Sequence, residues 1–288
     1  MLRKRVITAL WGIPLLTAAV WLEQPLPWFT MLVAIWGLLA AFEFYQLVKT
    51  AQKAAPLAYF GMVWSLLSIL SQDASLLALV ERHTGWLVFI GPFAFFNLLN
   101  ILIFTSAVII SFTWLISQTR RERAFTSWAW TMAGILYVGW LLSYLVALRG
   151  LDNGRNWGFL ALFTTFASDT AAFFVGRALG SHKLAPRISP GKTWEGAIGG
   201  VLSAIIVSLF FMLPTPLTLH LNWGQAAFLG LLVSIFGQLG DLLESLFKRK
   251  MGAKDSGRLL PGHGGVLDRM DSIVFAGMVV YYYAIWVA

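Results

Sequence analysis

The sequence predicts an all-α, polytopic integral membrane protein of about nine transmembrane helices, with the N-terminus in the cytoplasm and the C-terminus outside. Of its 288 residues, 58% are hydrophobic and only 12% are charged. The apolar residues form runs near the ~20 residues that a helix needs to cross a bilayer. The chain has no cysteine, which excludes disulfides, thiolate metal sites and a cysteine nucleophile.

The apolar runs give the predicted spans in chain order. They are residues 6–22, 28–48, 57–79, 86–117, 127–148, 157–178, 194–213, 223–247 and 272–287. The first is expected to be retained as a helix, because no small-x-small cleavage site follows it. The fourth is long enough for two short crossings.

Basic residues settle how the fourth run is counted. With a single crossing, almost all loop Lys and Arg fall on one side, and only Arg82, Arg149 and Arg155 fall on the other. Two crossings would place the later basic loops outside, contrary to the positive-inside rule. The net charge of +8 is therefore explained mostly by basic residues in the loops on the cytoplasmic side. It gives no support to a nucleic-acid partner.

The two halves of the chain differ in their polar residues. Residues 1–150 are hydrophobic helices, expected to form a scaffold for lipid access or dimer contacts. Residues 151–288 are expected to form a catalytic membrane domain with its site on the cytoplasmic side. A carboxylate at a helix centre costs about 2.5 to 3.5 kcal/mol, so Asp169, Asp241 and Glu244 are functional candidates. Glu43 lies shortly before Lys49 and is expected to snorkel to the interface.

The segment "GQLGDLLESLFKRK" predicts a polar stripe on the eighth span. Gln238, Asp241, Ser245 and Lys248 fall on one helical face, with Glu244 one step round. A structural seam between helices is the alternative, and it is the better interpretation of Gln238 or Ser245 taken alone. The continuation of the stripe into the polar segment that follows favours a functional role.

Asp169 lies in the segment "ALFTTFASDTAAFFVGR". Thr165, Asp169 and Ala172 share a helical face, and Ser168 is adjacent. Hydrogen bonding to these hydroxyls would make Asp169 a helix-packing residue. A second functional position is the other interpretation, and both stay open.

The loop "LGSHKLAPRISPGKTWEGAIGG" contains a "GKT" that resembles the tail of a phosphate-binding P-loop. Pro186 stands where that motif requires glycine, and no strand is expected before it. We expect a basic, turn-rich loop in which Ser189 or Thr193 caps the next helix. Lys192 is either a substrate contact or part of a solvated basic loop beside anionic lipid.

Residues 254–271, "KDSGRLLPGHGGVLDRMD", suit phosphate and metal. The three glycines 262, 264 and 265 allow the backbone to approach a phosphate oxygen closely. Lys254 and His263 can add positive charge or hydrogen bonds. A tight turn is the alternative for "GHGG" taken alone.

The end of this segment adds carboxylates. Asp268 and Asp271 are three residues apart on the first turn of the last helix, so both point the same way. Together with Asp241 they form a hard-oxygen set suited to Mg²⁺.

The stretch "SLFKRKMGAKDSGRLLPGHGGVLDRMD", residues 245–271, closely resembles the signature of the phosphatidate cytidylyltransferase family, also called CDP-diacylglycerol synthases. The segments "GQLGDLLES" and "SPGKTWEG" also resemble it, so the resemblance covers about residues 160–275. It implies nucleotidyl transfer from CTP to phosphatidic acid, giving CDP-diacylglycerol and pyrophosphate in phospholipid biosynthesis. It further implies a divalent cation such as Mg²⁺, with room for a second cation, a homodimer in the lipid bilayer, and a place in the cell membrane.

The resemblance also assigns roles to residues. The metal site falls on Asp241, Asp268 and Asp271, and Ser245 and Lys248 complete the catalytic set. The expected substrate-binding residues are Asp169, Lys192, Glu244, Lys254, His263, Gly264, Gly265 and Arg269.

Two other classes of function stay open. A CTP-dependent kinase of polyprenol or phytol would share the membrane and metal but transfer the γ-phosphoryl group. A cation or proton transporter would use Asp169, Asp241 and Glu244 as a relay. It would leave the glycine-histidine segment unexplained.

Overall fold

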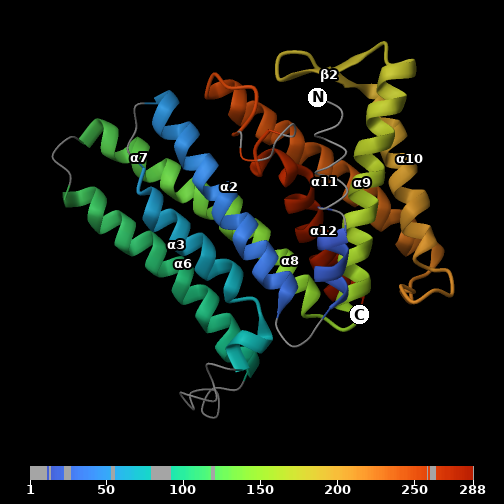
Figure 1. Cartoon of the computed structure of the whole chain (residues 1–288), viewed down its shortest axis with the longest axis horizontal. Helices are drawn as coiled ribbons and strands as arrows, with labels where there is room; N and C mark the ends of the chain where they lie inside the picture. Colours follow the sequence, from blue (N-terminus) through green and yellow to red (C-terminus); the bar gives the residue numbers. More distant parts are fainter. Residues whose placement is uncertain are drawn as a thin grey trace. The chain divides into compact units, whose positions relative to one another are not determined.

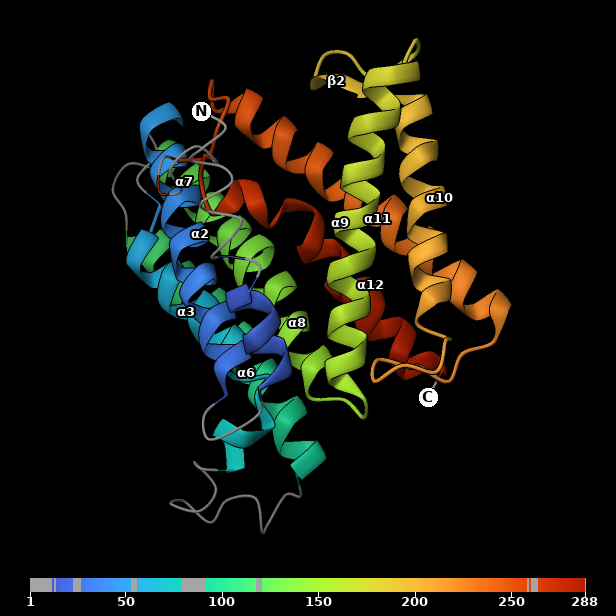
Figure 2. The ribbon, with the colours of Figure 1, turned by 45° about the vertical axis from the view of Figure 1, so that its right-hand side comes forward.

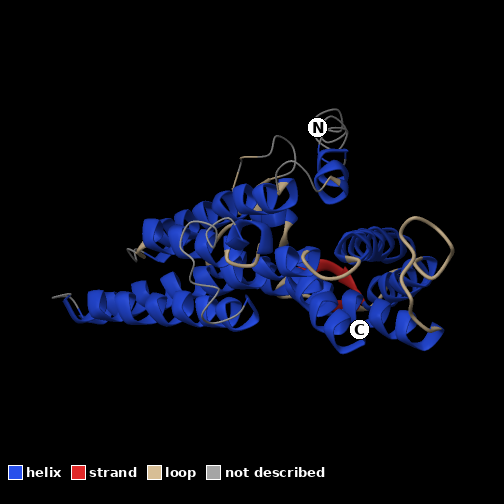
Figure 3. Cartoon of the chain, turned by 90° about the horizontal axis from the view of Figure 1, so that it is seen from below, coloured by secondary structure: helices blue, strands red, loops and turns tan. Residues whose placement is uncertain are grey.

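The computed structural model describes residues 12, 14–22, 27–52, 56–78, 92–117, 121–257, 259 and 264–287. Within these residues the chain is almost entirely helical, and Figure 3 shows its strands confined to one short hairpin. The principal helices, in chain order, are α2 (Trp28–Gln52), α3 (Ala58–Leu70), α6 (Pro92–Ser117), α7 (Arg121–Gly134), η1 (Ile135–Trp140), α8 (Leu141–Arg149), α9 (Gly154–Leu179), α10 (Trp194–Phe210), α11 (Trp223–Lys250), η2 (Leu267–Arg269) and α12 (Asp271–Val287).

The chain divides into two compact units. The first comprises residues 1–150 together with 256–267, and the second comprises residues 151–255 together with 268–288. The first division falls between Gly150 and Leu151. Residues 256–267 belong to the first unit, although they lie in the part of the chain expected to form the catalytic domain. The scaffold and catalytic roles of the two halves stay predictions.

The first unit packs helices around Tyr45 of α2. This side chain is 2% exposed, and its hydroxyl donates a hydrogen bond to the Thr131 carbonyl of α7 at 2.8 Å. Gly61 of α3 and Gly134 of α7 lie against the ring, where a Cβ at either position would overlap it. The two glycines therefore allow three helices to close around one aromatic side chain.

The second unit is held together by close helix approaches at glycines. The helices α9 and α10 run side by side in Figures 1 and 2, and a Cβ at Gly196 of α10 would lie 2.6 Å from the Ala172 carbonyl oxygen of α9. At Gly240 of α11, a Cβ would overlap the Asp271 carbonyl oxygen of α12. Small residues thus bring the backbones of α11 and α12 together at the point where both carry aspartates.

The basic loop before α10 folds as an antiparallel hairpin of β1 (Lys183–Ala185) and β2 (Ser189–Thr193). Figure 2 shows it at one end of α9 and α10. The expectation that no strand precedes "GKT" is therefore wrong. The predicted cap is confirmed for Thr193, whose side chain accepts a hydrogen bond from the Gly196 amide at 3.2 Å.

Within the part of the chain that the structure describes, five stretches are long and apolar enough to cross a membrane: Trp28–Gln52, Leu98–Ser117, Ala124–Arg149, Gly154–Leu179 and Trp223–Lys250. Shorter apolar helices occur at Ala58–Leu70, Trp194–Phe210 and Asp271–Val287. An all-α membrane protein is therefore confirmed at this coarse level. Of the predicted span 6–22, residues 6–11 and 13 lie outside the described residues.

Glu43 does not snorkel as predicted. Its side chain is 3% exposed and lies within the first unit. The carboxyl group accepts hydrogen bonds from the Ser256 hydroxyl at 2.9 Å and from the Leu267 amide at 3.0 Å. The nearness of Lys49 in sequence is misleading, because these partners lie more than 200 residues further along the chain.

Candidate active site

The second unit contains a cavity of about 750 Å³ lined by residues of α9, the hairpin, α10, α11, η2 and α12. Four carboxylates line it: Asp169, Asp241, Asp268 and Asp271. Its basic lining residues are Arg177, Lys183, Lys192 and Arg269. The cavity therefore brings together groups that can hold cations and groups that can hold phosphates.

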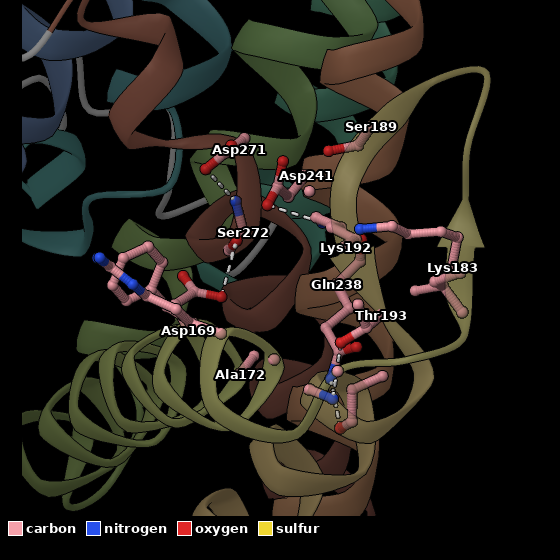
Figure 4. Close-up of a pocket in the computed structure, with 18 of the residues that line it drawn as sticks. Asp169, Ala172, Lys183, Ser189, Lys192, Thr193, Gln238, Asp241, Asp271 and Ser272 are labelled. Carbon is pink, nitrogen blue, oxygen red and sulfur yellow. Dashed lines mark hydrogen bonds and ion pairs between the residues drawn. The ribbon is translucent and has the colours of Figure 1, made fainter.

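Asp241 is positioned by α11 and faces the hairpin. The Lys192 ammonium lies 2.7 Å from Asp241 Oδ2, and Ser245 one turn further along donates a hydrogen bond to Oδ1 at 3.3 Å. Lys183 extends from β1 in the same direction (Figure 4). The Asp241 side chain is 31% exposed, so its carboxylate stays accessible from the cavity.

Asp271 begins α12, and Asp169 lies in the middle of α9. The Ser272 amide donates to Asp271 Oδ1 at 2.8 Å, and the Ser272 hydroxyl lies 3.5 Å from Asp169 Oδ1. Figure 4 shows both contacts. Ser272 thus links the two carboxylates. The predicted hydrogen bonds from Thr165 and Ser168 to Asp169 are not formed. Thr165 donates to the Ala161 carbonyl instead, and Ser168 shares a hydrogen bond with Ser234.

Lys248 is engaged by two carboxylates. Its ammonium lies 2.6 Å from Glu244 Oε2, one turn back on α11, and 2.7 Å from Asp268 Oδ1. The Glu244 side chain is fully buried, and those of Asp268 and Lys248 are 7% and 13% exposed. At 2.6 Å the contact between Lys248 and Glu244 is an ion pair. The network fixes Asp268 relative to α11.

Comparison with known proteins identifies the family. The model of a family described as "Cytidylyltransferase family" matches residues 3–287. The chain belongs to the cytidylyltransferase family. It is 38% identical over 289 residues to the phosphatidate cytidylyltransferase of Brucella suis biovar 1, covering 97% of this chain and 92% of the relative. It is 32% identical to the Bacillus subtilis protein of the same name over 88% of this chain and 87% of that one.

The site residues predicted for this cytidylyltransferase-family chain fall into three groups. Asp169, Lys192, Asp241, Asp268, Asp271 and Arg269 line the cavity. Ser245, Lys248, Glu244, Lys254, Gly264 and Gly265 do not line it, although Ser245 contacts Asp241, Lys248 contacts Asp268, and Glu244 pairs with Lys248. His263 lies outside the described residues.

Sequence reasoning missed Lys183 and Arg177 as cavity residues. Lys183 pairs in register with Thr193 across the hairpin, and Arg177 lies in the last turn of α9. Both were counted only as positive charges on the cytoplasmic side. The signal that identifies Lys183 is the hairpin itself, because antiparallel pairing places it beside the β2 residues that precede α10.

The sequence predicts a metal centre of three carboxylates, Asp241, Asp268 and Asp271. Among the described residues, no group of three His, Cys, Asp or Glu side chains is arranged to hold a metal ion. Asp268 is turned to Lys248 and Asp241 to Lys192. Mg²⁺ commonly takes only one or two protein carboxylates and completes its shell with water and substrate phosphates. The cavity oxygens of Asp241 and Asp271 suit that mode of binding.

Proposed function

We propose that this chain transfers the cytidylyl group of CTP to phosphatidic acid, forming CDP-diacylglycerol and pyrophosphate. The observation that carries the proposal is the cavity in which aspartates from α9, α11, η2 and α12 face the lysines of the hairpin. Two polyanionic substrates require such a mixture of charges. The relatives named phosphatidate cytidylyltransferase supply the substrate pair.

The reaction needs no protein nucleophile. A phosphate oxygen of phosphatidate attacks the α-phosphorus of CTP, the new P–O bond forms, and the bond from the α-phosphorus to the bridging oxygen breaks. That electron pair leaves on pyrophosphate. The protein's contribution is alignment and charge neutralisation. Lys183, Lys192 and Arg269 are the cavity cations available for the triphosphate and for the lipid phosphate.

The bound cation is proposed to be Mg²⁺, held by Asp241 and Asp271 with Asp268 close by, and a second cation is compatible with Asp169. When bound there, such an ion would neutralise charge on the triphosphate and on the leaving pyrophosphate. Lys192 pairs with Asp241 in this structure, so its ammonium lies beside a carboxylate that would hold the ion.

The proposed setting is the cell membrane, with nine crossings, the N-terminus and the cavity on the cytoplasmic side, and the C-terminus outside. The single continuous helix α6 supports one crossing in the segment whose count was in question. The family resemblance supports a homodimer. Residues 1–150 are proposed to serve as scaffold for lipid access or dimer contacts.

The test is incubation of the purified full-length protein in detergent with phosphatidate, Mg²⁺ and CTP labelled either at the α- or at the γ-phosphate. Label from the α-position is expected in the lipid and label from the γ-position in pyrophosphate. Transfer of γ-label to the lipid would refute the proposal in favour of a lipid kinase. Chelation of the divalent cation should abolish turnover, and added Mg²⁺ should restore it.

A further inference from the structure

Glu43 is a buried carboxyl group that the proposed chemistry does not use. It lies on α2 in the first unit, and its Oε2 atom receives both the Ser256 hydroxyl and the Leu267 amide. Its Oε1 atom has no hydrogen-bond partner among the described residues. Burial of a carboxyl group in an apolar bundle is unfavourable unless it is hydrogen-bonded, so these two contacts are the structural reason that Glu43 is tolerated there.

The segment that Glu43 holds is shaped to fit it closely. A Cβ at Gly257 or at Gly265 would overlap the Glu43 carboxyl group, and at Gly265 it would also overlap the Ser256 hydroxyl oxygen. The side chains of Ser256, Val266 and Leu267 are buried, at 4%, 3% and 2% exposure. Both ends of this segment, Ser256 and Leu267, are therefore held against the Glu43 carboxyl group. Two hydrogen bonds, two close glycines and buried side chains hold them there.

The C-terminal end of the segment continues directly into residues that line the cavity. Leu267, whose amide Glu43 holds, is the first residue of η2, and the next two residues of that helical turn are Asp268 and Arg269. Both line the cavity of the second unit. Fixing the backbone at Leu267 therefore restricts where Asp268 and Arg269 can stand, through covalent geometry alone.

We propose that Glu43 is a positioning residue for cytidylyl transfer: it accepts hydrogen bonds that set Leu267, and thereby restrains the backbone of the η2 turn that carries Asp268 and Arg269. The inference rests on the proposed function. Both bonds go to the same oxygen, so a glutamine with its carbonyl oxygen in that place can accept both. The role is one of hydrogen-bond acceptance at a fixed point and requires no charge.

The test compares Glu43→Gln with Glu43→Leu in the full-length protein in detergent, following turnover and hydrogen exchange in peptides that cover residues 264–270. Glu43→Leu should exchange roughly tenfold faster at Leu267, because its amide loses its acceptor. Its kcat should fall about 10²-fold, the effect expected from a displacement near 1 Å. Glu43→Gln should stay close to wild type in both measurements.

Two results would overturn the proposal. One is a Glu43→Leu protein in which the Leu267 amide exchanges at the wild-type rate, whether or not its turnover falls. The other is Glu43→Gln falling as far as Glu43→Leu, which would mean that charge and not acceptance is required. A wild-type protein with no turnover would refute the proposed function, while the exchange measurement would still decide whether Glu43 holds Leu267.

A second pair of variants covers the case in which Glu43→Leu does not fold. Gly265→Ala would displace the Glu43 contact, whereas Gly61→Ala would cause a comparable overlap with Tyr45 elsewhere in the first unit. Only Gly265→Ala should accelerate exchange at Leu267 and lower kcat when both proteins are compared below their melting temperatures. Equal effects of the two substitutions would reduce the role of Glu43 to ordinary core packing and overturn the proposal.

Discussion

At the scale of single residues, the charged side chains of the second unit pair with one another. Lys192 pairs with Asp241, and Lys248 pairs with both Glu244 and Asp268. The two pairs differ in exposure: Asp241 is 31% exposed, whereas Glu244 is fully buried. The accessible pair can open to ligands, and the buried network has a supporting function.

Asp241→Asn and Asp271→Asn are each expected to lower kcat by at least about 10²-fold. Each substitution removes the negative charge of a carboxylate that is proposed to hold the Mg²⁺ ion. Both proteins should still fold and insert into the membrane. The measurement is turnover with saturating CTP, phosphatidate and Mg²⁺, with size-exclusion chromatography as the folding check. The exposed Asp152→Asn is the matched control. Near-normal turnover in either variant would remove that aspartate from the site.

Lys248 was predicted to hold substrate phosphate, and that role stays untested, but its contacts point first to stability. Lys248→Gln leaves two nearly buried carboxylates without their cation, a change of the kind that costs about 3 to 5 kcal/mol. Its melting temperature should therefore fall well below that of Lys250→Gln, whose side chain is exposed. Combining Lys248→Gln with Glu244→Gln should recover part of the loss, since one of the two stranded charges is gone. Equal melting temperatures for the two single variants would contradict the network.

At the scale of secondary-structure elements, the aspartates meet because the helices that carry them approach closely. Gly240 stands next to Asp241 in sequence and against the Asp271 carbonyl in space. The hairpin then brings Lys192 over the same helix. The site is therefore a product of helix packing, and its geometry should respond to substitutions that touch no ligand.

Gly240→Ala is expected to impair catalysis through the helix approach alone. Its Cβ would overlap the Asp271 carbonyl and lie 2.7 Å from Phe275 Cδ2, so α11 and α12 must separate. Overpacking of this kind costs about 1 to 3 kcal/mol. Gly237→Ala, on the same helix, meets Ser272 only at 3.7 Å and serves as control. Melting temperature and kcat should fall in the first variant and stay close to wild type in the second.

The sequence predicts part of this site for clear physical reasons. Asp241 stands out because a carboxylate within an apolar run is costly. Asp268 and Asp271 stand out because their spacing predicts one helical turn, although in the structure Asp268 lies in η2 and Asp271 begins α12. Lys183 does not stand out, since its proximity depends on hairpin pairing. Glu43 was misjudged, because sequence spacing to Lys49 says nothing about partners more than 200 residues away.

At the scale of the whole molecule, long apolar helices and asymmetric basic loops together suggest a fixed orientation in the bilayer. The helix α9, with 26 residues, is about 39 Å long at 1.5 Å per residue, enough to span the hydrocarbon core. Asp152 precedes it, and Ser181 follows it in the basic hairpin region. These two exposed positions are therefore expected to lie on opposite sides of the membrane.

The absence of native cysteine makes this orientation directly testable. Ser181→Cys should react with a membrane-impermeant thiol reagent only from the cytoplasmic side, and Asp152→Cys only from the outside, in accord with the positive-inside rule. The measurement is labelling of intact cells compared with inverted membrane vesicles. Labelling of both positions from the same side would refute the nine-crossing topology.

The late return of residues 256–267 to the first unit affects how this protein is made. Ser256 follows Glu43 by 213 residues, which at about 5 to 20 residues per second is roughly 10 to 40 s of synthesis. During that interval the early helices are already complete, yet the carboxyl group of Glu43 has neither of its partners. A fragment ending at residue 150 would remain in this condition permanently. Supplying residues 151–288 as a separate chain should therefore protect that fragment from degradation by membrane proteases.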